Sequence, residues 1–563
     1  MPSLLQIKNL HVEFTNNDAT TKALHGISFE VNKGEIVAVV GESGSGKSVT
    51  AMSVLQLLPS PPAKYTNGEI LFNGGGESAV NLLNLTEKEL RNIRGNKISM
   101  IFQEPMTSLN PVFSCGQQVA EAIQLHDKVS KKEALQRTIE LFKQVQLPEP
   151  EKIINRYPFQ LSGGQKQRVM IAMAMSCSPS LLIADEPTTA LDVTVQKRIL
   201  QLIKELQQKN NMGVIFITHD LGVVAEVADK VVVMYKGNIV EQGPVKTVLQ
   251  SPKHPYTQAL LQCRPALHPK GERLPVISDF LEPKQQANPP AKVVSDQKKK
   301  SSEVLLEVRN LTVKFPSVKN FFGRTLEYNT AVDKISFDIY KGETLGLVGE
   351  SGCGKTTLGR TLLRLQDAQE GQIIFEGKDL LSIDKDELRG RRKDFQIVFQ
   401  DPYSSLNPRK TAGSAITEPL HVHEVLTSTS KRKELAMELL GKVNLQPEHF
   451  YRYPHEFSGG QRQRIGIARA LALNPGFIIF DESVSALDVS VQAQVLNLLT
   501  DLKTEFNFTA IFISHDLSVV KYISDRIIVM RKGKIEEIGY AEAIYSNPQS
   551  DYTAQLLRAI PTV

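Results

Sequence analysis

Gly41-Glu42-Ser43-Gly44-Ser45-Gly46-Lys47-Ser48 is the most informative stretch of this sequence. It has the spacing G-x-x-x-x-G-K-S, follows an apolar run at residues 35–40 that is typical of a buried strand, and precedes a run at 49–58 that favours a helix. Glycines let such a loop turn so that successive N–H groups point at one anion, and the helix N-terminus adds partial positive charge. The stretch therefore predicts a phosphate-binding loop.

The same pattern occurs a second time, at residues 349–356, after the apolar run 344–348. A glycine-rich turn without a ligand is the alternative interpretation, and the repetition argues against it. In such loops the lysine reaches the β- and γ-phosphates and the following hydroxyl ligates Mg²⁺. The residues that we expect to bind nucleotide here are Gly41, Ser43, Gly44, Gly46, Lys47, Ser48, Gly349, Ser351, Gly352, Gly354, Lys355 and Thr356.

Size and composition limit the class of protein. A chain of 563 residues is too long for one hydrophobic core, so several domains are expected. A net charge of +5 is small for this length and gives no strong case for nucleic acid as a partner. The sequence contains no apolar run long enough to span a bilayer and no signal-peptide pattern, which favours a cytosolic location. Four scattered cysteines are expected to be free thiols.

An internal repeat organises the chain. Residues 4–10 recur as 305–311, and residues 161–165 recur as 457–461. We expect a first domain at 1–264, a linker at 265–302 that is rich in proline and lysine, and a second domain at 303–563. The linker's prolines and its run of three lysines predict an extended, exposed tether.

Strand and helix patterns alternate within each half. Residues 181–184 and 214–217 read as strands around a helix at 193–208, and residues 131–145 and 431–443 read as amphipathic helices. Each half also opens with β-type alternation, at 5–14 and 306–315. This order predicts an α/β fold with a parallel sheet and a helical insertion.

Two acids end a buried strand in each half. The pairs are Asp185-Glu186 and Asp481-Glu482. The aspartate can hold Mg²⁺, and the glutamate can polarise the water that attacks the γ-phosphorus. The alternative, a helix N-cap or a solvated turn, is disfavoured because each pair accompanies its own phosphate-binding loop.

A serine and two glycines open a helix between each loop and its acid pair, at residues 162–164 and 458–460. In this place the motif resembles the signature of ATP-binding-cassette (ABC) ATPases, and the resemblance covers both halves. It implies that each half has a RecA-like parallel-sheet core, a helical subdomain and an antiparallel β subdomain, and that ATP and Mg²⁺ are the cofactors.

The resemblance also implies roles for further residues. Two cassettes would sandwich two ATP molecules head to tail, with loops 190–192 and 486–488 crossing the interface. The weakest implication is that Phe14 and Phe315 stack on adenine, since Phe321, Phe322 and Tyr328 compete. The implied catalytic residues are Glu186, Glu482, His219 and His515; the implied metal site residues are Ser48, Gln103, Asp185, Thr356, Gln400 and Asp481; and Gln103, Gln400, Ser162, Gly164, Ser458 and Gly460 would also contact nucleotide.

Three further stretches resemble the ATPase subunits of oligopeptide, dipeptide and nickel importers. They are residues 103–111 with 400–408, 156–160 with 452–456, and an extension at 254–261 with 550–557. The halves resemble the two different subunits of such importers, fused as in microcin-C-type peptide importers. The resemblance implies two separate integral-membrane permease subunits, an extracytoplasmic solute-binding protein and a peripheral location at the cytoplasmic face of the bacterial inner membrane. Peptides are the expected cargo, and peptide antibiotics, nickel and glutathione are the alternatives.

A rival class is a soluble tandem-cassette ATPase that acts on ribosomes or nucleic acid. Such proteins usually have a long charged helical linker or zinc-binding cysteines, and this chain has neither pattern. Many first subunits of peptide importers carry a cysteine-rich tail for an iron–sulfur cluster. Residues 264–300 contain no cysteine, so we expect no cluster.

Overall fold

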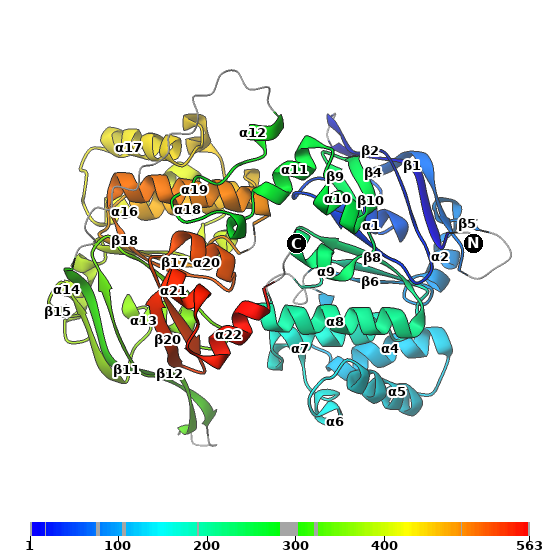
Figure 1. Cartoon of the computed structure of the whole chain (residues 1–563), viewed down its shortest axis with the longest axis horizontal. Coiled ribbons are helices and arrows are strands. Elements are labelled where there is room, and N and C mark those ends of the chain that lie inside the picture. The colour runs from blue at the N-terminus through cyan, green and yellow to red at the C-terminus, as the bar shows by residue number, and fades with distance from the viewer. Residues whose placement is uncertain are drawn as a thin grey trace.

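The computed structural model describes residues 3–16, 19–74, 79–103, 108–188, 191–281, 302–319, 325–485 and 487–560. Residues 104–107, 189–190 and 486, most of the expected linker (282–301), and Phe321 and Phe322 lie outside this set. Figure 1 shows two halves side by side, the first on the right and the second on the left. Both halves have the three-part architecture that the resemblance implies.

An antiparallel sheet covers one side of each half. Its strand order is β2-β1-β4-β5 in the first half and β12-β11-β14-β15 in the second. The strands are β1 (Leu5–Asn16), β2 (Ala19–Val31), β4 (Ala63–Phe72), β5 (Val80–Asn81), β11 (Val304–Lys319), β12 (Thr325–Tyr340), β14 (Glu370–Phe375) and β15 (Lys378–Asp379).

A six-stranded sheet forms the centre of each half, in the order β10-β9-β3-β8-β7-β6 and β16-β17-β18-β13-β19-β20. All neighbouring strands pair in parallel except β9 with β10 and β19 with β20, which are antiparallel. The strands are β3 (Ile36–Val40), β6 (Ile98–Ile101), β7 (Leu181–Asp185), β8 (Gly213–Thr218), β9 (Lys230–Tyr235), β10 (Asn238–Pro244), β13 (Thr344–Val348), β16 (Phe395–Val398), β17 (Phe477–Asp481), β18 (Thr509–Ile513), β19 (Arg526–Arg531) and β20 (Lys534–Tyr540).

Helices flank these sheets, and the helical insertion follows β6 and β16. The first half has α1 (Lys47–Val54), α2 (Glu87–Ile93), α4 (Cys115–Asp127), α5 (Lys131–Gln144), α6 (Pro150–Ile153), α7 (Gly163–Ala174), α8 (Val193–Asn210), α9 (Leu221–Val227), α10 (Val245–Gln250), α11 (Pro255–Gln262) and α12 (Ser278–Leu281). The second half has α13 (Lys355–Leu362), α14 (Lys385–Arg391), α15 (Pro402–Ser405), α16 (Ala412–Val422), α17 (Thr429–Lys442), α18 (Gly459–Leu471), α19 (Val489–Phe506), α20 (Leu517–Ile523), α21 (Ala541–Ser546) and α22 (Asp551–Arg558).

The central sheet separates two hydrophobic cores, because successive side chains of a strand point to opposite faces. In β7, Leu181 and Ile183 pack with α1 and the antiparallel sheet, whereas Leu182 and Ala184 pack with the helical insertion. Both faces are buried, which is why this strand is an unbroken apolar run. The run ends at Asp185, at the carboxyl edge of the sheet.

The expected exposed tether is wrong for residues 265–281, which we call the docked segment. Leu274 is 1% exposed, and both its backbone N–H and its carbonyl are hydrogen-bonded by the side chain of Asn497 in α19. Lys270 pairs with Asp525, and Glu272 accepts from the Tyr522 hydroxyl. Proline-rich composition does not reveal that apolar side chains such as Leu274 and Ile277 are buried, so composition alone misjudged the exposure of this segment. In Figure 1, α12 lies next to α11, which it contacts, and above α19 of the second half.

Candidate nucleotide-binding sites

Each phosphate-binding loop joins the central strand β3 or β13 to the helix α1 or α13, as predicted. The first glycine of each loop is sterically required. A β-carbon on Gly41, where φ is +152°, would lie 2.2 Å from the carbonyl oxygen of Met234. Gly349, with φ of +149°, meets the carbonyl of Met530 at the same distance. Both loops therefore have the same tight backbone path.

The loop lysines are buried and point into their own loops. The Lys47 Nζ donates to the carbonyls of Gly41 at 2.7 Å and Glu42 at 2.8 Å. Lys355 repeats this with Gly349 and Glu350, at 2.7 and 3.0 Å. Each ammonium group is thus held by two carbonyls of its own loop, beside the backbone that would bind an anionic phosphate.

The hydroxyl after each lysine faces the aspartate at the end of the neighbouring strand. Thr356 Oγ1 donates to Asp481 Oδ1 at 3.0 Å, and Ser48 bonds Asp185. Burial raises the pKa of Asp185, the Ser48 hydroxyl opposes this, and the negative charge of Glu186 adds to it. Asp185 Oδ1 is buried without a hydrogen-bond partner among the described residues. A buried, unpartnered carboxylate oxygen beside a hydroxyl suits a divalent cation.

The glutamate, histidine and glutamine of each half converge. Glu186 accepts from Gln103 Nε2 at 3.1 Å and lies 3.4 Å from His219 Nδ1. Burial would lower the pKa of His219, but the hydrogen bond and charge of Glu186 outweigh it, so the pKa is raised. The backbone of Glu186 has φ of +47°, an uncommon conformation for a non-glycine residue that turns its side chain away from the strand.

The second half repeats this cluster. Glu482 accepts from Gln400 Nε2 at 2.8 Å and lies 3.4 Å from His515 Nδ1. Burial raises the pKa of Glu482, but the hydrogen bond and charge of His515 outweigh it, so the pKa is lowered. A glutamate held ionised beside a phosphate-binding loop can accept a proton from water.

The two halves complete each other's loops. Asp488 of the second half accepts a hydrogen bond from the backbone N–H of Ser43 at 2.7 Å, and Ser490 Oγ contacts the Glu42 carboxylate. In the reciprocal contact, Thr194 Oγ1 donates to the carboxylate of Glu350 at 2.8 Å. This exchange is the head-to-tail arrangement that the resemblance implies. Ala190 and Ala486, which were expected in the crossing loops, lie outside the described residues.

The signature glycines lie next to these crossing contacts. A β-carbon on Gly460 would lie 2.6 Å from Val491 Cγ1, and Val491 follows Ser490 in α19. Gly164 meets Val195, the neighbour of Thr194, at 2.8 Å. The signature serines Ser162 and Ser458 cap α7 and α18, and each hydroxyl accepts from a backbone N–H three residues on. Each signature motif therefore packs beside a residue whose neighbour in sequence contacts the phosphate-binding loop of the opposite half.

Sequence reasoning missed two tyrosines at the loops. The hydroxyl of Tyr256 accepts from the backbone N–H of Glu42 at 3.0 Å, and that of Tyr552 accepts from Glu350 at 3.3 Å. Their signal was their occurrence at the same place in both copies of the extension. Phe14 and Phe315 are half-buried against the cores below the antiparallel sheets, and their stacking on adenine stays a prediction.

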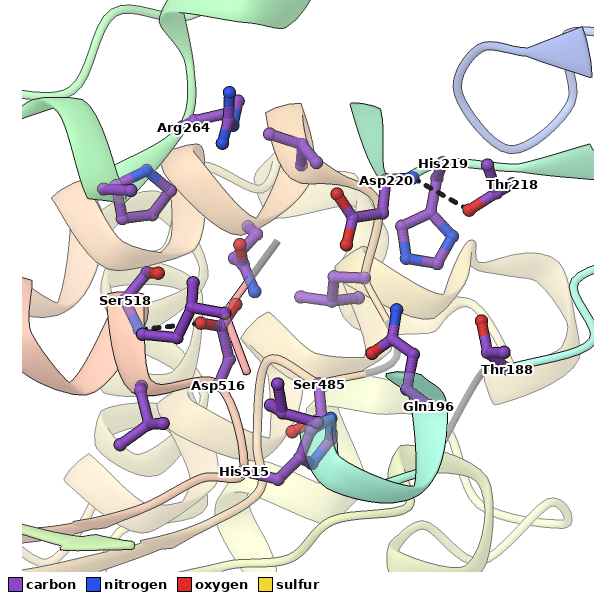
Figure 2. Close-up of a pocket in the computed structure, with 18 of the residues that line it drawn as sticks. Thr188, Gln196, Thr218, His219, Asp220, Arg264, Ser485, His515, Asp516 and Ser518 are labelled. Atoms are coloured by element: carbon purple, nitrogen blue, oxygen red, sulfur yellow. Dashed lines mark hydrogen bonds between the residues drawn. The ribbon is translucent and has the colours of Figure 1, made fainter. Parts of the chain in front are cut away.

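A pocket of about 150 Å³ lies between the two sites and is lined by both halves. Figure 2 shows His219 and Asp220 on one side of it and His515 and Asp516 on the other, with Arg264 at its edge. The two histidines that contact the glutamates thus border one shared space.

Comparison with known proteins agrees with this geometry. The family model "ABC transporter" matches residues 24–189 and 332–485, and the model "Oligopeptide/dipeptide transporter, C-terminal region" matches 240–289. The glutathione import ATP-binding proteins GsiA of Escherichia coli (strain K12) and Shigella sonnei (strain Ss046) are each 50% identical over 565 residues, which cover 99% of this chain and 90% of the relative.

Among solved structures, the dimeric MJ0796, a bacterial ABC transporter cassette, matches with 29% identity and a TM-score of 0.38, over 42% of this chain and 98% of that chain. In the described part of the chain, no helix is both long and apolar enough for a membrane span. The family models together with the relatives at 50% identity establish that this chain belongs to the ABC transporter family, as an ATP-binding ATPase subunit of the importer type with two tandem cassettes.

Proposed function

We propose that this chain hydrolyses ATP at two composite sites and thereby drives the uptake of small peptides through separate permease subunits. The observation that carries the proposal is the reciprocal exchange in which Asp488 binds the loop of the first cassette and Asp192 binds that of the second. Each site then contains a complete set of residues, so both are proposed to be hydrolytic.

Site one takes its phosphate-binding and catalytic residues from the first cassette and its signature from the second. Site two is the reverse. The proposed members of site one are Gly41, Ser43, Gly44, Gly46, Lys47, Ser48, Gln103, Asp185, Glu186, His219, Ser458 and Gly460; those of site two are Gly349, Ser351, Gly352, Gly354, Lys355, Thr356, Gln400, Asp481, Glu482, His515, Ser162 and Gly164.

The proposed metal ligands fit Mg²⁺. Ser48 with Asp185, and Thr356 with Asp481, place a hydroxyl beside a buried carboxylate, and Gln103 and Gln400 lie within reach of the neighbouring glutamates. Mg²⁺ bound there would neutralise charge on the transferred phosphoryl group. The protein's own contribution is to hold the water beside Glu186 or Glu482, which accepts its proton.

Exposed aromatic side chains on the helical insertions support a permease partner. Phe113 and Phe159 of the first cassette are 51% and 69% exposed, and Tyr403 and Tyr451 of the second are 65% and 58% exposed. Exposed aromatic side chains are enriched at protein interfaces. They follow the glutamines Gln103 and Gln400 in the chain, where the importer resemblance implies contact with the permease. Residues 104–107 of that region lie outside the described residues.

The solute is proposed to be a peptide or a peptide-like molecule such as glutathione. The relatives are named for glutathione import, and the matching C-terminal region is named for oligopeptide and dipeptide transporters. In such systems the permeases and an extracytoplasmic binding protein select the solute. The chain itself is proposed to lie at the cytoplasmic face of the membrane, held there by the permeases.

Affinity capture tests this proposal. Tagged chain would be purified from detergent-solubilised membranes of its native host, and the retained proteins would be identified by mass spectrometry. Two polytopic permease chains, with or without a solute-binding protein, are the expected result. A Phe113→Ser/Tyr403→Ser variant should lose them while keeping its ATPase activity. Recovery of ribosomal proteins or nucleic acid instead would reject the importer and favour the soluble tandem-cassette class.

A further inference from the structure

The extension of each cassette ends in a helix whose function the fold alone does not explain. Helices α11 and α22 follow the hairpin at the edge of the central sheet, and each carries one buried tyrosine near its start, Tyr256 or Tyr552. Each tyrosine hydroxyl accepts a hydrogen bond from the second residue of its own phosphate-binding loop. This hydrogen bond occurs in both halves, and in each half it joins residues that are more than 200 positions apart in the sequence.

The extension is anchored in the same way on both sides. Glu241 of β10 accepts from the backbone N–H groups of Lys253 and His254, at 2.9 and 3.1 Å, just before α11. Glu537 of β20 accepts from those of Gln549 and Ser550 at the same distances. A carboxylate that receives two backbone donors holds the start of the helix in a fixed place. The strand therefore fixes the start of the helix that carries the tyrosine.

Packing fixes the rings as well. Tyr256 is fully buried, and its ring centroid lies 4.3 Å from that of Tyr235. The guanidinium of Arg531 lies 4.7 Å from the ring centre of Tyr552. Burial raises the pKa of both phenols well above the ordinary value, so they stay neutral and available as acceptors at any physiological pH.

The glutamate that each tyrosine contacts, Glu42 or Glu350, makes three contacts in all. The N–H of Glu42 is accepted by Tyr256, its carbonyl accepts from Lys47 Nζ, and its carboxylate contacts Ser490 of the opposite cassette. Glu350 is joined in the same way to Tyr552, Lys355 and Thr194. The peptide unit that joins Gly41 to Glu42 donates its N–H to Tyr256 and accepts from Lys47 Nζ at the Gly41 carbonyl, at 2.7 Å. A shift of this unit would therefore move both the lysine and the contact between the cassettes.

We propose that Tyr256 and Tyr552 are positioning residues for ATP binding, which hold the backbone at Glu42 and Glu350 so that each lysine and each crossing contact are aligned before nucleotide arrives. The extension is thereby part of each ATP site, acting through the loop and without touching the nucleotide. This rests on the assignment of Lys47 and Lys355 to the ATP sites made above.

The conservative change to phenylalanine tests the role. Tyr256→Phe and Tyr552→Phe keep the buried ring and remove only the acceptor. Loss of one backbone hydrogen bond should weaken binding of the fluorescent analogue mant-ATP by about three- to tenfold, and raise KM for ATP by a similar factor with a smaller change in kcat. Tyr522→Phe is the matched control, because it removes a buried hydroxyl that bonds the backbone carbonyl of Glu272 at 2.7 Å, away from both loops.

The full chain is used throughout, and thermal unfolding of each variant is recorded without nucleotide. Weaker mant-ATP binding in both loop tyrosine variants but not in Tyr522→Phe, at equal melting temperature, is the expected result. Unchanged binding in Tyr256→Phe and Tyr552→Phe, or equal weakening in the control, rejects the positioning role. The variant Lys47→Ala/Lys355→Ala distinguishes failure of the positioning role from failure of the ATP-site assignment. If this variant loses mant-ATP binding while the tyrosine variants bind normally, only the positioning role is rejected. If this variant binds mant-ATP normally, the ATP sites as assigned are rejected.

Discussion

The carboxylate of Asp192, which precedes α8 of the first cassette, accepts a hydrogen bond of 2.5 Å from the backbone N–H of Ser351 in the phosphate-binding loop of the second cassette. Asp488 and Ser43 form the reciprocal bond at 2.7 Å. The two bonds are related by the internal repeat of the chain. They tie the geometry of each loop to the helix that begins beside the acid pair of the opposite cassette.

Removing either aspartate should lower ATP hydrolysis at the loop it contacts. A hydrogen bond to an ionised acceptor contributes about 1.5–3 kcal/mol, so Asp192→Ala/Asp488→Ala should reduce kcat by roughly tenfold or more. Steady-state phosphate release measures this. Asp386→Ala, which removes an exposed aspartate in the first turn of α14, is the control. Wild-type turnover in the double variant would show that the crossing bonds do not support catalysis.

Replacement of each glutamate tests whether both sites are hydrolytic. Glu186→Gln and Glu482→Gln keep the side-chain shape but cannot accept a proton from water, so each should remove at least half of the ATPase activity. The double variant should lose about 100-fold or more while still binding mant-ATP. Full ATPase activity surviving either single change would contradict two active sites.

The signature glycines predict a contrast in stability between neighbouring residues. Gly460→Ala would place a methyl group 2.6 Å from the stiff, β-branched Val491, whereas Gly459 has open space around it. Overpacking costs about 1–3 kcal/mol, so Gly460→Ala should lower the melting temperature by roughly 2–12 °C. Gly459→Ala should leave it unchanged or raise it slightly. Equal melting temperatures for the two variants would argue against this packing.

In the docked segment, we expect the buried hydrogen bonds of Asn497 to stabilise docking more than the exposed ion pair between Arg273 and Asp501 does. Asn497→Leu would leave the N–H and carbonyl of Leu274 buried without partners, at about 1–3 kcal/mol for each group. Arg273 and Asp501 are 57% and 54% exposed, so Arg273→Ala should cost about 0–1 kcal/mol. The rate of limited proteolysis within residues 265–281 measures how readily this segment leaves the second cassette. Faster cleavage in Arg273→Ala than in Asn497→Leu would reverse this ranking.

The histidine–glutamate pairs predict a pH-dependent part of the stability. The pKa of His219 and of His515 is raised by the partner glutamate despite burial, so the protonated form is favoured in the folded chain. This contribution is fully present below about pH 6.5, the unfolded pKa, and is lost as the pH rises through the raised folded value. The melting temperature of His219→Gln/His515→Gln should therefore fall furthest below wild type near pH 6, with the gap narrowing towards pH 9. A gap that does not depend on pH would contradict the pairing.

Local sequence was enough to predict the α/β fold, the loops and the acid pairs, because each depends on a short run of residues. Gly41 to Ser48 and the apolar strand that ends at Asp185 carry their structural meaning within a few positions. The meeting of Glu186 with Gln103 and His219 required the family resemblance, since three separate segments contribute to it.

Contacts made by long-range packing were not predictable. Nothing near Tyr256 in sequence indicates that its hydroxyl reaches Glu42, and nothing in the proline-rich composition after residue 264 indicates that Leu274 is buried against Asn497. Both contacts depend on where the edge of the central sheet and α19 lie in space. For Tyr256, the only available signal was that the internal repeat places an equivalent tyrosine at position 552.

The two cassettes belong to one chain, and residues 265–281, which follow the first cassette, are docked on the second. Association of the two cassettes is therefore a unimolecular event. Modules joined in one chain experience each other at an effective concentration near the millimolar range, whatever the concentration of the chain. Separate subunits at nanomolar concentration would dissociate between encounters. In this chain the two cassettes are always present in equal number and stay linked. Dilution should therefore leave the ATP turnover per molecule unchanged.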